Sequence, residues 1–223
     1  MKDINNLAAG FIQECGLCQH PLKTARTIGN ESPTAYHQGF NLENDVAAPT
    51  GYSYLLSLQY CEKCGYSAVN FPESSPEEIR ALVQSIPYQL QWSDESLPKL
   101  ARVFLCKGIL DVAKQRIVDA AYSALAAAWV CDERADETAA IWCRKLAAEY
   151  FRRYFSNNSR LDSAQQQILF HYVDVCRKAG LLQRARQLCR AIAQQPLDAD
   201  QQLRLALLQG QLQSSDSSPT IML

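Results

Sequence analysis

Two Cys-x-x-Cys pairs in the first third of the chain constrain its fold more than any other feature. Cys15 and Cys18 form the first pair, and Cys61 and Cys64 form the second within the stretch CEKCGY. Each such turn directs two sulfur atoms toward one point, so two of them supply the four thiolates of a tetrahedral zinc site. The sequence therefore predicts a structural zinc site whose ligands are Cys15, Cys18, Cys61 and Cys64.

The long spacer between the pairs does not oppose this prediction. Forty-two residues separate Cys18 from Cys61, and closing a loop of that length costs about 3 kcal/mol plus a constant. Structural zinc supplies roughly 10–16 kcal/mol at neutral pH, so metal binding outweighs the loop entropy. Gly65 follows the second pair directly and suits the positive φ that the chain often needs there.

Other interpretations of the four cysteines stay open. Iron in a rubredoxin-like site would have the same ligand geometry. His20 or His37 could replace one cysteine as a ligand. Two unrelated pairs of core cysteines are a further alternative, whereas a thioredoxin-like redox pair needs a βαβ setting that the surrounding sequence does not show.

The whole composition indicates a cytoplasmic protein. The chain has 223 residues, 48% of them hydrophobic, and a net charge of −1. No apolar run approaches the roughly 18 residues of a membrane span, and the start lacks the apolar core of a signal peptide. A reducing compartment disfavours disulfides. We expect the cysteines outside the two pairs to be small buried residues: Cys106, Cys131, Cys143, Cys176 and Cys189.

Alternating hydrophobicity predicts strands around the second pair. In YSYLLSLQYC, which ends at Cys61, every second residue from Tyr52 to Tyr60 falls on one face, and this period of two is typical of a strand. The stretch SAVNF after the pair is expected to return as its partner, and residues 22–27 to form a short strand. We therefore predict a small β zinc ribbon over residues 1–73, with an irregular insertion at 29–51.

From residue 74 the pattern is helical, so the predicted fold is mainly α. The stretch SSPEE places a capping serine and a proline at a helix start, and Pro87 is expected to end that helix. An antiparallel helical bundle is predicted over 74–213, followed by a disordered tail at 214–223.

The last helices resemble one tetratricopeptide unit in the spacing of Gly180, Ala185 and Pro196. In such a stack the first helix of a unit lines the inner face. We expect Leu169, Tyr172 and Cys176 to pack inward. The residues left to face outward, as a candidate partner surface, include Gln166, Phe170, His171, Asp174 and Arg177. For Phe170 the alternative is that it packs under a neighbouring helix, and we favour this alternative slightly.

The layout as a whole resembles a bacterial family of unknown function. The features that carry the resemblance are CEKCGYSAVNF, the alternating strand before it, the earlier Cys-x-x-Cys pair and the helical remainder. Members of that family have a zinc-ribbon-like segment ending in a CxxCGY motif, followed by a tetratricopeptide-like domain. The resemblance implies this architecture, with ligand cysteines at Cys15, Cys18, Cys61 and Cys64, and it implies no activity.

These features favour a non-enzymatic zinc-binding adaptor with a protein or peptide partner. Four thiolates leave a zinc ion no position for substrate, and three histidines and no Gly-rich phosphate loop leave little material for catalysis. The acidic residues Asp132, Glu133, Asp136 and Glu137 stand at a predicted helix junction, where capping is their expected role. Because a short stack buries little groove, we expect dimerisation or a large partner surface.

The alternative function is a nucleic-acid-associated zinc ribbon. Residues 1–72 carry four basic and six acidic side chains, a net charge of −2, and a four-thiolate zinc centre adds about −2. Nucleic-acid binding normally needs clustered positive charge. The charge of this region therefore disfavours nucleic acid as a partner, and nothing in the sequence indicates a membrane.

Overall fold

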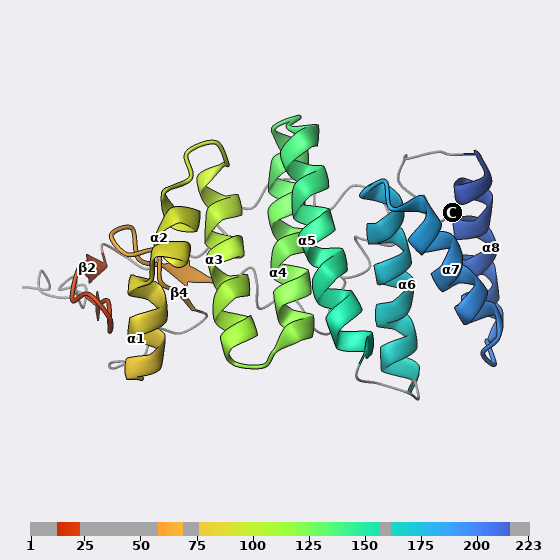
Figure 1. The fold of residues 1–223 in the computed structure, drawn as a ribbon, viewed down its shortest axis with the longest axis horizontal. Helices are drawn as coiled ribbons and strands as arrows, with labels where there is room; N and C mark the ends of the chain where they lie inside the picture. The colour runs from red at the N-terminus through yellow and green to blue at the C-terminus, as the bar shows by residue number, and fades with distance from the viewer. Residues whose placement is uncertain (1–12, 23–57, 69–75, 157–161, 215–223) are drawn as a thin grey trace, which may run out of the picture.

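The computed structural model describes residues 13–22, 58–68, 76–156 and 162–214, and this part of the chain is mainly helical (Figure 1). Two small antiparallel strand pairs precede eight helices in the described ranges. The strands are β1 (Gln13–Glu14), β2 (Pro21–Leu22), β3 (Gln59–Tyr60) and β4 (Ser67–Ala68). The helices are α1 (Glu77–Gln84), α2 (Ile86–Ser93), α3 (Lys99–Ala113), α4 (Ile117–Glu133), α5 (Glu137–Ser156), α6 (Ser163–Lys178), α7 (Leu182–Ala193) and α8 (Ala199–Ser214).

The longer helices form an antiparallel row along the long axis of the molecule. From α3 to α8 each helix packs against the next one in the chain, and Figure 1 shows them side by side in chain order. The strand pairs lie at the α1 end of this row. The predicted fold class, mainly α with a small β segment beside the cysteines, is therefore confirmed.

Three of the helix–helix turns have the same backbone geometry. Gln115, Ala135 and Gly180 take positive φ values of 60°, 55° and 74° directly after α3, α4 and α6. In each turn the next N–H reaches back to a carbonyl five residues earlier, as in Arg116 N to Asp111 O at 2.8 Å. This is the Schellman ending, which satisfies carbonyl groups that the helix leaves open. Repetition of one turn keeps successive helices antiparallel.

Helix α4 forms the middle of the core because most of its side chains are small. Its buried residues include a series of alanines with an exposure of 0–1%, among them Ala121, Ala124 and Ala128. Small side chains let α3 and α5 approach α4 from both sides, and both helices pack against it. The larger side chains of the core surround this centre, with Tyr122 meeting the Phe151 ring edge-on at 5.3 Å between centroids.

The structure corrects two predictions about the helices. Helix α1 ends at Gln84, and Pro87 lies in the first turn of a further helix, α2. A proline tolerates the first turn because its missing N–H has no partner there. The predicted outward face of α6 is also wrong, because His171, Asp174 and Arg177 are at most 4% exposed, whereas Phe170 packs in the core, as its favoured alternative predicted.

The burial of that α6 face has a visible cause in the packing of the row. Helix α6 contacts α5, α7 and α8, and His171 Nδ1 lies 2.8 Å from the hydroxyl oxygen of Tyr122 on α4. The buried charges satisfy each other, since Arg177 donates to Asp174 Oδ1 from two nitrogens at 2.7 and 2.9 Å. A helix with neighbours on several sides hides polar residues that its sequence pattern would expose.

Several predictions lie outside the described residues. These are the strand before residue 58, the insertion at 29–51, the capping role of Ser75 and the tail from residue 215. The domain boundaries at residues 73 and 213 stay predictions.

Candidate metal centre

Each Cys-x-x-Cys pair lies in a short hairpin, and the two hairpins have equivalent hydrogen bonds. In the first, β1 pairs with β2 and the N–H of Cys15 donates to His20 O at 3.0 Å. In the second, β3 pairs with β4 and the N–H of Cys61 donates to Tyr66 O at 2.8 Å. The residue after each second cysteine donates back to the first one, at 2.8 Å from Gln19 and 2.9 Å from Gly65. We call the two hairpins the first and the second knuckle.

Both knuckles need a residue with positive φ at the same place. Gly65 takes a φ of 75° in the second knuckle, as the sequence predicted, and Gln19 takes 56° in the first. A residue with a side chain pays about 1–2 kcal/mol for this conformation. The first knuckle thus adopts the geometry of the second without its glycine.

The knuckles bring all four predicted cysteines into one cluster. Their sulfur atoms lie within 4.8 Å of one another, with 3.7 Å between Cys15 and Cys64 and 3.6 Å between Cys18 and Cys61. Tetrahedral zinc with Zn–S bonds of about 2.3 Å separates its sulfurs by about 3.8 Å. The distances and the donor set therefore suit one tetrahedrally coordinated ion.

Backbone N–H groups support the sulfur atoms from the same positions in both knuckles. The N–H groups of Leu17 and Cys18 reach the sulfur of Cys15, and those of Lys63 and Cys64 reach the sulfur of Cys61. Such hydrogen bonds favour the thiolate, which is the form that binds metal.

The close approach of the sulfurs makes their acidity unequal. Hydrogen bonds from the thiols of Cys61 and Cys64 lower the pKa of Cys15 to about 2. The contact with Cys15 raises the pKa of Cys61 to about 11, and contacts with Cys15 and Cys61 raise the pKa of Cys64. One thiolate is thus stabilised by protons held on its neighbours, and a metal cation would replace those protons.

Among the described residues, only cysteines belong to the cluster of candidate ligands, and no histidine does. His20 is half-buried beside the first knuckle, where its carbonyl oxygen accepts the hydrogen bond from Cys15. It does not belong to the group whose ligand atoms converge. His37 lies outside the described residues.

Helices α1 and α2 hold the knuckles through backbone carbonyl groups. From α1, Arg80 Nη1 donates to Leu17 O at 2.6 Å. From α2, the Tyr88 hydroxyl donates to Gly65 O at 3.0 Å, and Gln89 Nε2 donates to Cys64 O at 3.1 Å. The ring of Trp92 lies so close to Gly65 that a Cβ there would stand 2.6 Å from its Cδ2 atom. Both helices therefore rest on the cysteine cluster.

Sequence reasoning missed these supporting residues. Their only local signal was the spacing of Tyr88 and Trp92, one helical turn apart, in a stretch after Pro87 for which no element was predicted. An apolar cluster completes the support beneath them. It joins residues of both knuckles to α1, α2 and α3, and comprises Cys15, Leu17, Cys61, Tyr66, Ile79, Val83, Tyr88, Cys106 and Leu110.

The other cysteines are buried as predicted. Their exposure is 0–3% in every case: Cys106, Cys131, Cys143, Cys176 and Cys189. Burial is the main cause that raises the pKa of Cys106 and Cys176 to about 12.

Of the acidic residues at the α4–α5 junction, Asp136 accepts a hydrogen bond from Ala139 N at 3.0 Å and caps α5, as predicted. Asp132 instead accepts two hydrogen bonds from Arg144, one of them at 3.0 Å.

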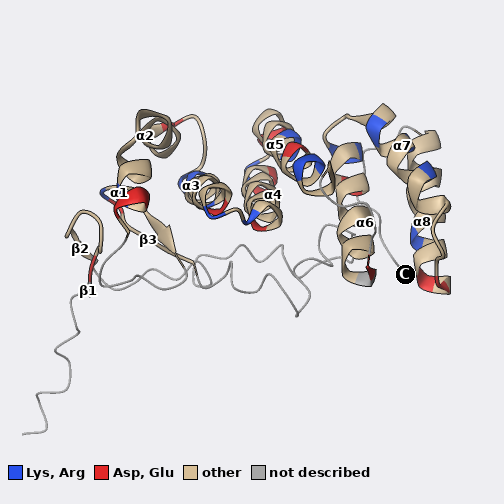
Figure 2. Cartoon of the chain, turned by 60° about the horizontal axis from the view of Figure 1, so that its bottom comes forward, with Lys and Arg blue, Asp and Glu red and all other residues tan. Residues whose placement is uncertain are grey.

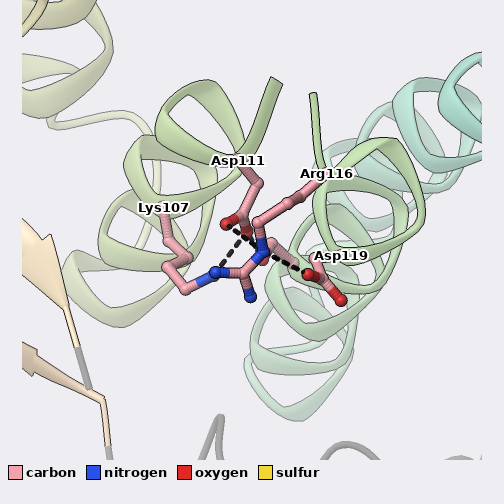
Figure 3. A network of polar contacts seen from close by, with 5 residues as sticks. Lys107, Asp111, Arg116 and Asp119 are labelled. Atoms are coloured by element: carbon pink, nitrogen blue, oxygen red, sulfur yellow. Dashed lines mark hydrogen bonds and ion pairs between the residues drawn. The ribbon is translucent and has the colours of Figure 1, made fainter. Parts of the chain in front are cut away.

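A second polar cluster lies between α3 and α4 (Figure 3). Lys107 donates to Asp111 one turn later on α3, and both side chains are at most 6% exposed. Arg116 reaches into the same group from the start of α4, with its Nε 3.9 Å from Asp111 Oδ1 and 2.6 Å from Asp119 Oδ2. Burial lowers the pKa of Lys107 and raises that of Asp111, so the ionised pair is costly to bury.

The fold and the cysteine cluster define a class: a mainly helical protein with a four-cysteine metal-site geometry at one end of its helix row. The chain belongs to the family described as "Uncharacterized protein conserved in bacteria (DUF2225)", whose profile matches residues 15–210. This confirms the resemblance seen in the sequence. No curated protein matches the chain, and no solved structure matches it. Within the described residues, none of the helices combines the length and apolarity of a membrane span.

Proposed function

We propose that this protein is a cytoplasmic, non-enzymatic adaptor that binds a protein partner and is stabilised by a structural zinc ion. The observation that carries the proposal is the closed cluster of four cysteine sulfurs within 4.8 Å. An ion bound by Cys15, Cys18, Cys61 and Cys64 has all four tetrahedral positions filled by protein. It has no open position for water or substrate, so its contribution is to folding.

The helix row supports the binding part of the proposal. Antiparallel helix pairs with repeated turns are typical of tetratricopeptide-like stacks, which present extended surfaces to proteins or peptides. Ile86 and Leu90 stand one turn apart on α2 and are 76% and 64% exposed. Exposed apolar side chains on a helix that rests on the metal centre are typical of a contact surface.

Nucleic acid is the less favoured partner. The described residues of the two knuckles carry Glu14, Glu62 and Lys63, and four thiolates around zinc add about −2. A negative metal centre repels phosphate.

Elemental analysis of freshly purified, reduced protein tests the metal part of the proposal. We expect one zinc per chain, and iron would be recognised by its visible absorption. Protein without any metal would contradict the site.

Affinity capture from native cytoplasm tests the adaptor part. We expect a stoichiometric protein partner that resists nuclease treatment, and a nuclease-sensitive complex would favour the nucleic-acid alternative.

A further inference from the structure

Positive charge is concentrated near the end of the row opposite the cysteine cluster. Residues 178–197 contain Lys178, Arg184, Arg186 and Arg190 but no acidic residue. The whole chain carries −1 and this stretch carries +4, so the remainder carries −5. Figure 2 shows basic residues and no acidic ones on α7. The molecule is therefore electrically asymmetric, and its α7 region attracts anionic partners.

Arginine residues of α5 and α7 act on one carboxylate of α5, that of Glu149. Arg152 donates to both oxygens of Glu149, at 2.7 and 2.6 Å. The hydrogen bond from Arg152 and the charges of Arg153 and Arg184 all lower the pKa of Glu149. We call Arg152, Arg153 and Arg184 the arginine face. Among the described residues that these electrostatics connect, the one carboxylate of Glu149 balances one of the three positive charges.

Aromatic side chains hold two of these arginines in place. Arg184 Nε donates to the hydroxyl oxygen of Tyr172 on α6 at 3.2 Å. The guanidinium of Arg153 lies over the Tyr150 ring, 6.0 Å from its centroid. All three arginines of the face are solvent-exposed. Side chains that are positioned before binding lose less conformational entropy when a ligand arrives.

We propose that the arginine face docks a short acidic segment of the protein partner, a proposal that rests on the adaptor function. A guanidinium group matches a carboxylate with two parallel hydrogen bonds, and Arg152 already binds Glu149 in this way. The carboxylates of the segment bind Arg153 and Arg184 in the same way.

The size of the positive region favours a peptide over nucleic acid. Helix α7 has 12 residues and is about 18 Å long. Duplex DNA carries about ten charges over that distance and continues beyond it. A short acidic segment contacts the positive region alone.

Fluorescence anisotropy with a labelled polyglutamate decapeptide tests the proposal on the full chain at low salt. We expect the wild type to bind, with an affinity that falls as salt rises. The double variant Arg153→Gln, Arg184→Gln should bind about fivefold more weakly, since two exposed ion pairs are lost. The matched control Lys114→Gln, Arg134→Gln removes the same charge from exposed positions at the ends of α3 and α4 and should bind like the wild type.

Two results of the anisotropy assay would overturn the proposal. One is equal loss of peptide affinity in both double variants, which would mean that only net charge matters. The other is that a single-stranded oligonucleotide binds more tightly than the peptide and that Arg153→Gln, Arg184→Gln weakens the binding of this oligonucleotide. Affinity capture separates this proposal from the adaptor function. If the Arg153→Gln, Arg184→Gln protein retrieves the wild-type partner at wild-type yield, the docking surface is wrong and the adaptor function stands.

Discussion

Gly65 is the position where a single methyl group should test how the helices hold the metal centre. The residue has a φ of 75°, and a Cβ there would lie 2.6 Å from Trp92 Cδ2 and 2.7 Å from Trp92 Cγ. The left-handed conformation costs an alanine about 1 kcal/mol. Displacing a packed indole adds about 1–3 kcal/mol. We therefore expect Gly65→Ala to lower the free energy of unfolding by about 2–4 kcal/mol.

Two other glycines of the chain separate these contributions. Gly180 has a nearly identical φ of 74°, but nothing lies within 4 Å of the place that a Cβ would take there, so Gly180→Ala should show the conformational cost alone, about 1 kcal/mol. Gly210 lies inside α8 with open space around it. Gly210→Ala should stabilise the protein by about 0.5–1 kcal/mol because alanine is the better helix former.

Denaturant unfolding of the metal-loaded proteins measures these differences, and competition with a chromogenic chelator measures metal retention. Gly65→Ala should lose metal faster than wild type, because the clash with Trp92 shifts the backbone of the second knuckle, where the Gly65 N–H donates to Cys61 O. Gly180→Ala should retain metal like wild type. Replacing Trp92 by Leu in the Gly65→Ala background should recover part of the loss. Equal destabilisation by Gly65→Ala and Gly180→Ala would refute the role assigned to the Trp92 contact.

The remaining predictions concern the metal and a buried ion pair. Cys61→Ser should lose the bound metal and Cys176→Ser should keep it, as measured by elemental analysis. Chelation should remove hydrogen-exchange protection from α1 and α2, because eight-residue helices are not stable alone. Helices α3–α8 should keep their protection. Unchanged protection in α1 after chelation would contradict this prediction. Lys107→Met should destabilise the fold by about 3–5 kcal/mol because Asp111 stays buried, whereas Lys107→Met with Asp111→Leu should be nearly neutral in denaturant unfolding. A double variant as unstable as the single one would show that the pair contributes net stability.

The sequence alone determined the composition of the candidate metal site. Cysteine is the residue that provides thiolate ligands, and the Cys-x-x-Cys spacing forms its turn from local backbone hydrogen bonds. For the same reason the positive φ at Gly65 and the helical class of residues 76–156 and 162–214 were predictable. Both depend on interactions between residues that are near each other in the chain.

The tertiary structure alone decided what surrounds these local elements. Pro87 is compatible with both a helix end and a helix start, and the packing of Tyr88 and Trp92 on the second knuckle selects the start. The polar face of α6 is buried because α4, α5, α7 and α8 contact that helix, which its own periodicity does not encode. Burial and charge clustering depend on neighbours that are distant in sequence, so the fold had to be known before either could be assigned.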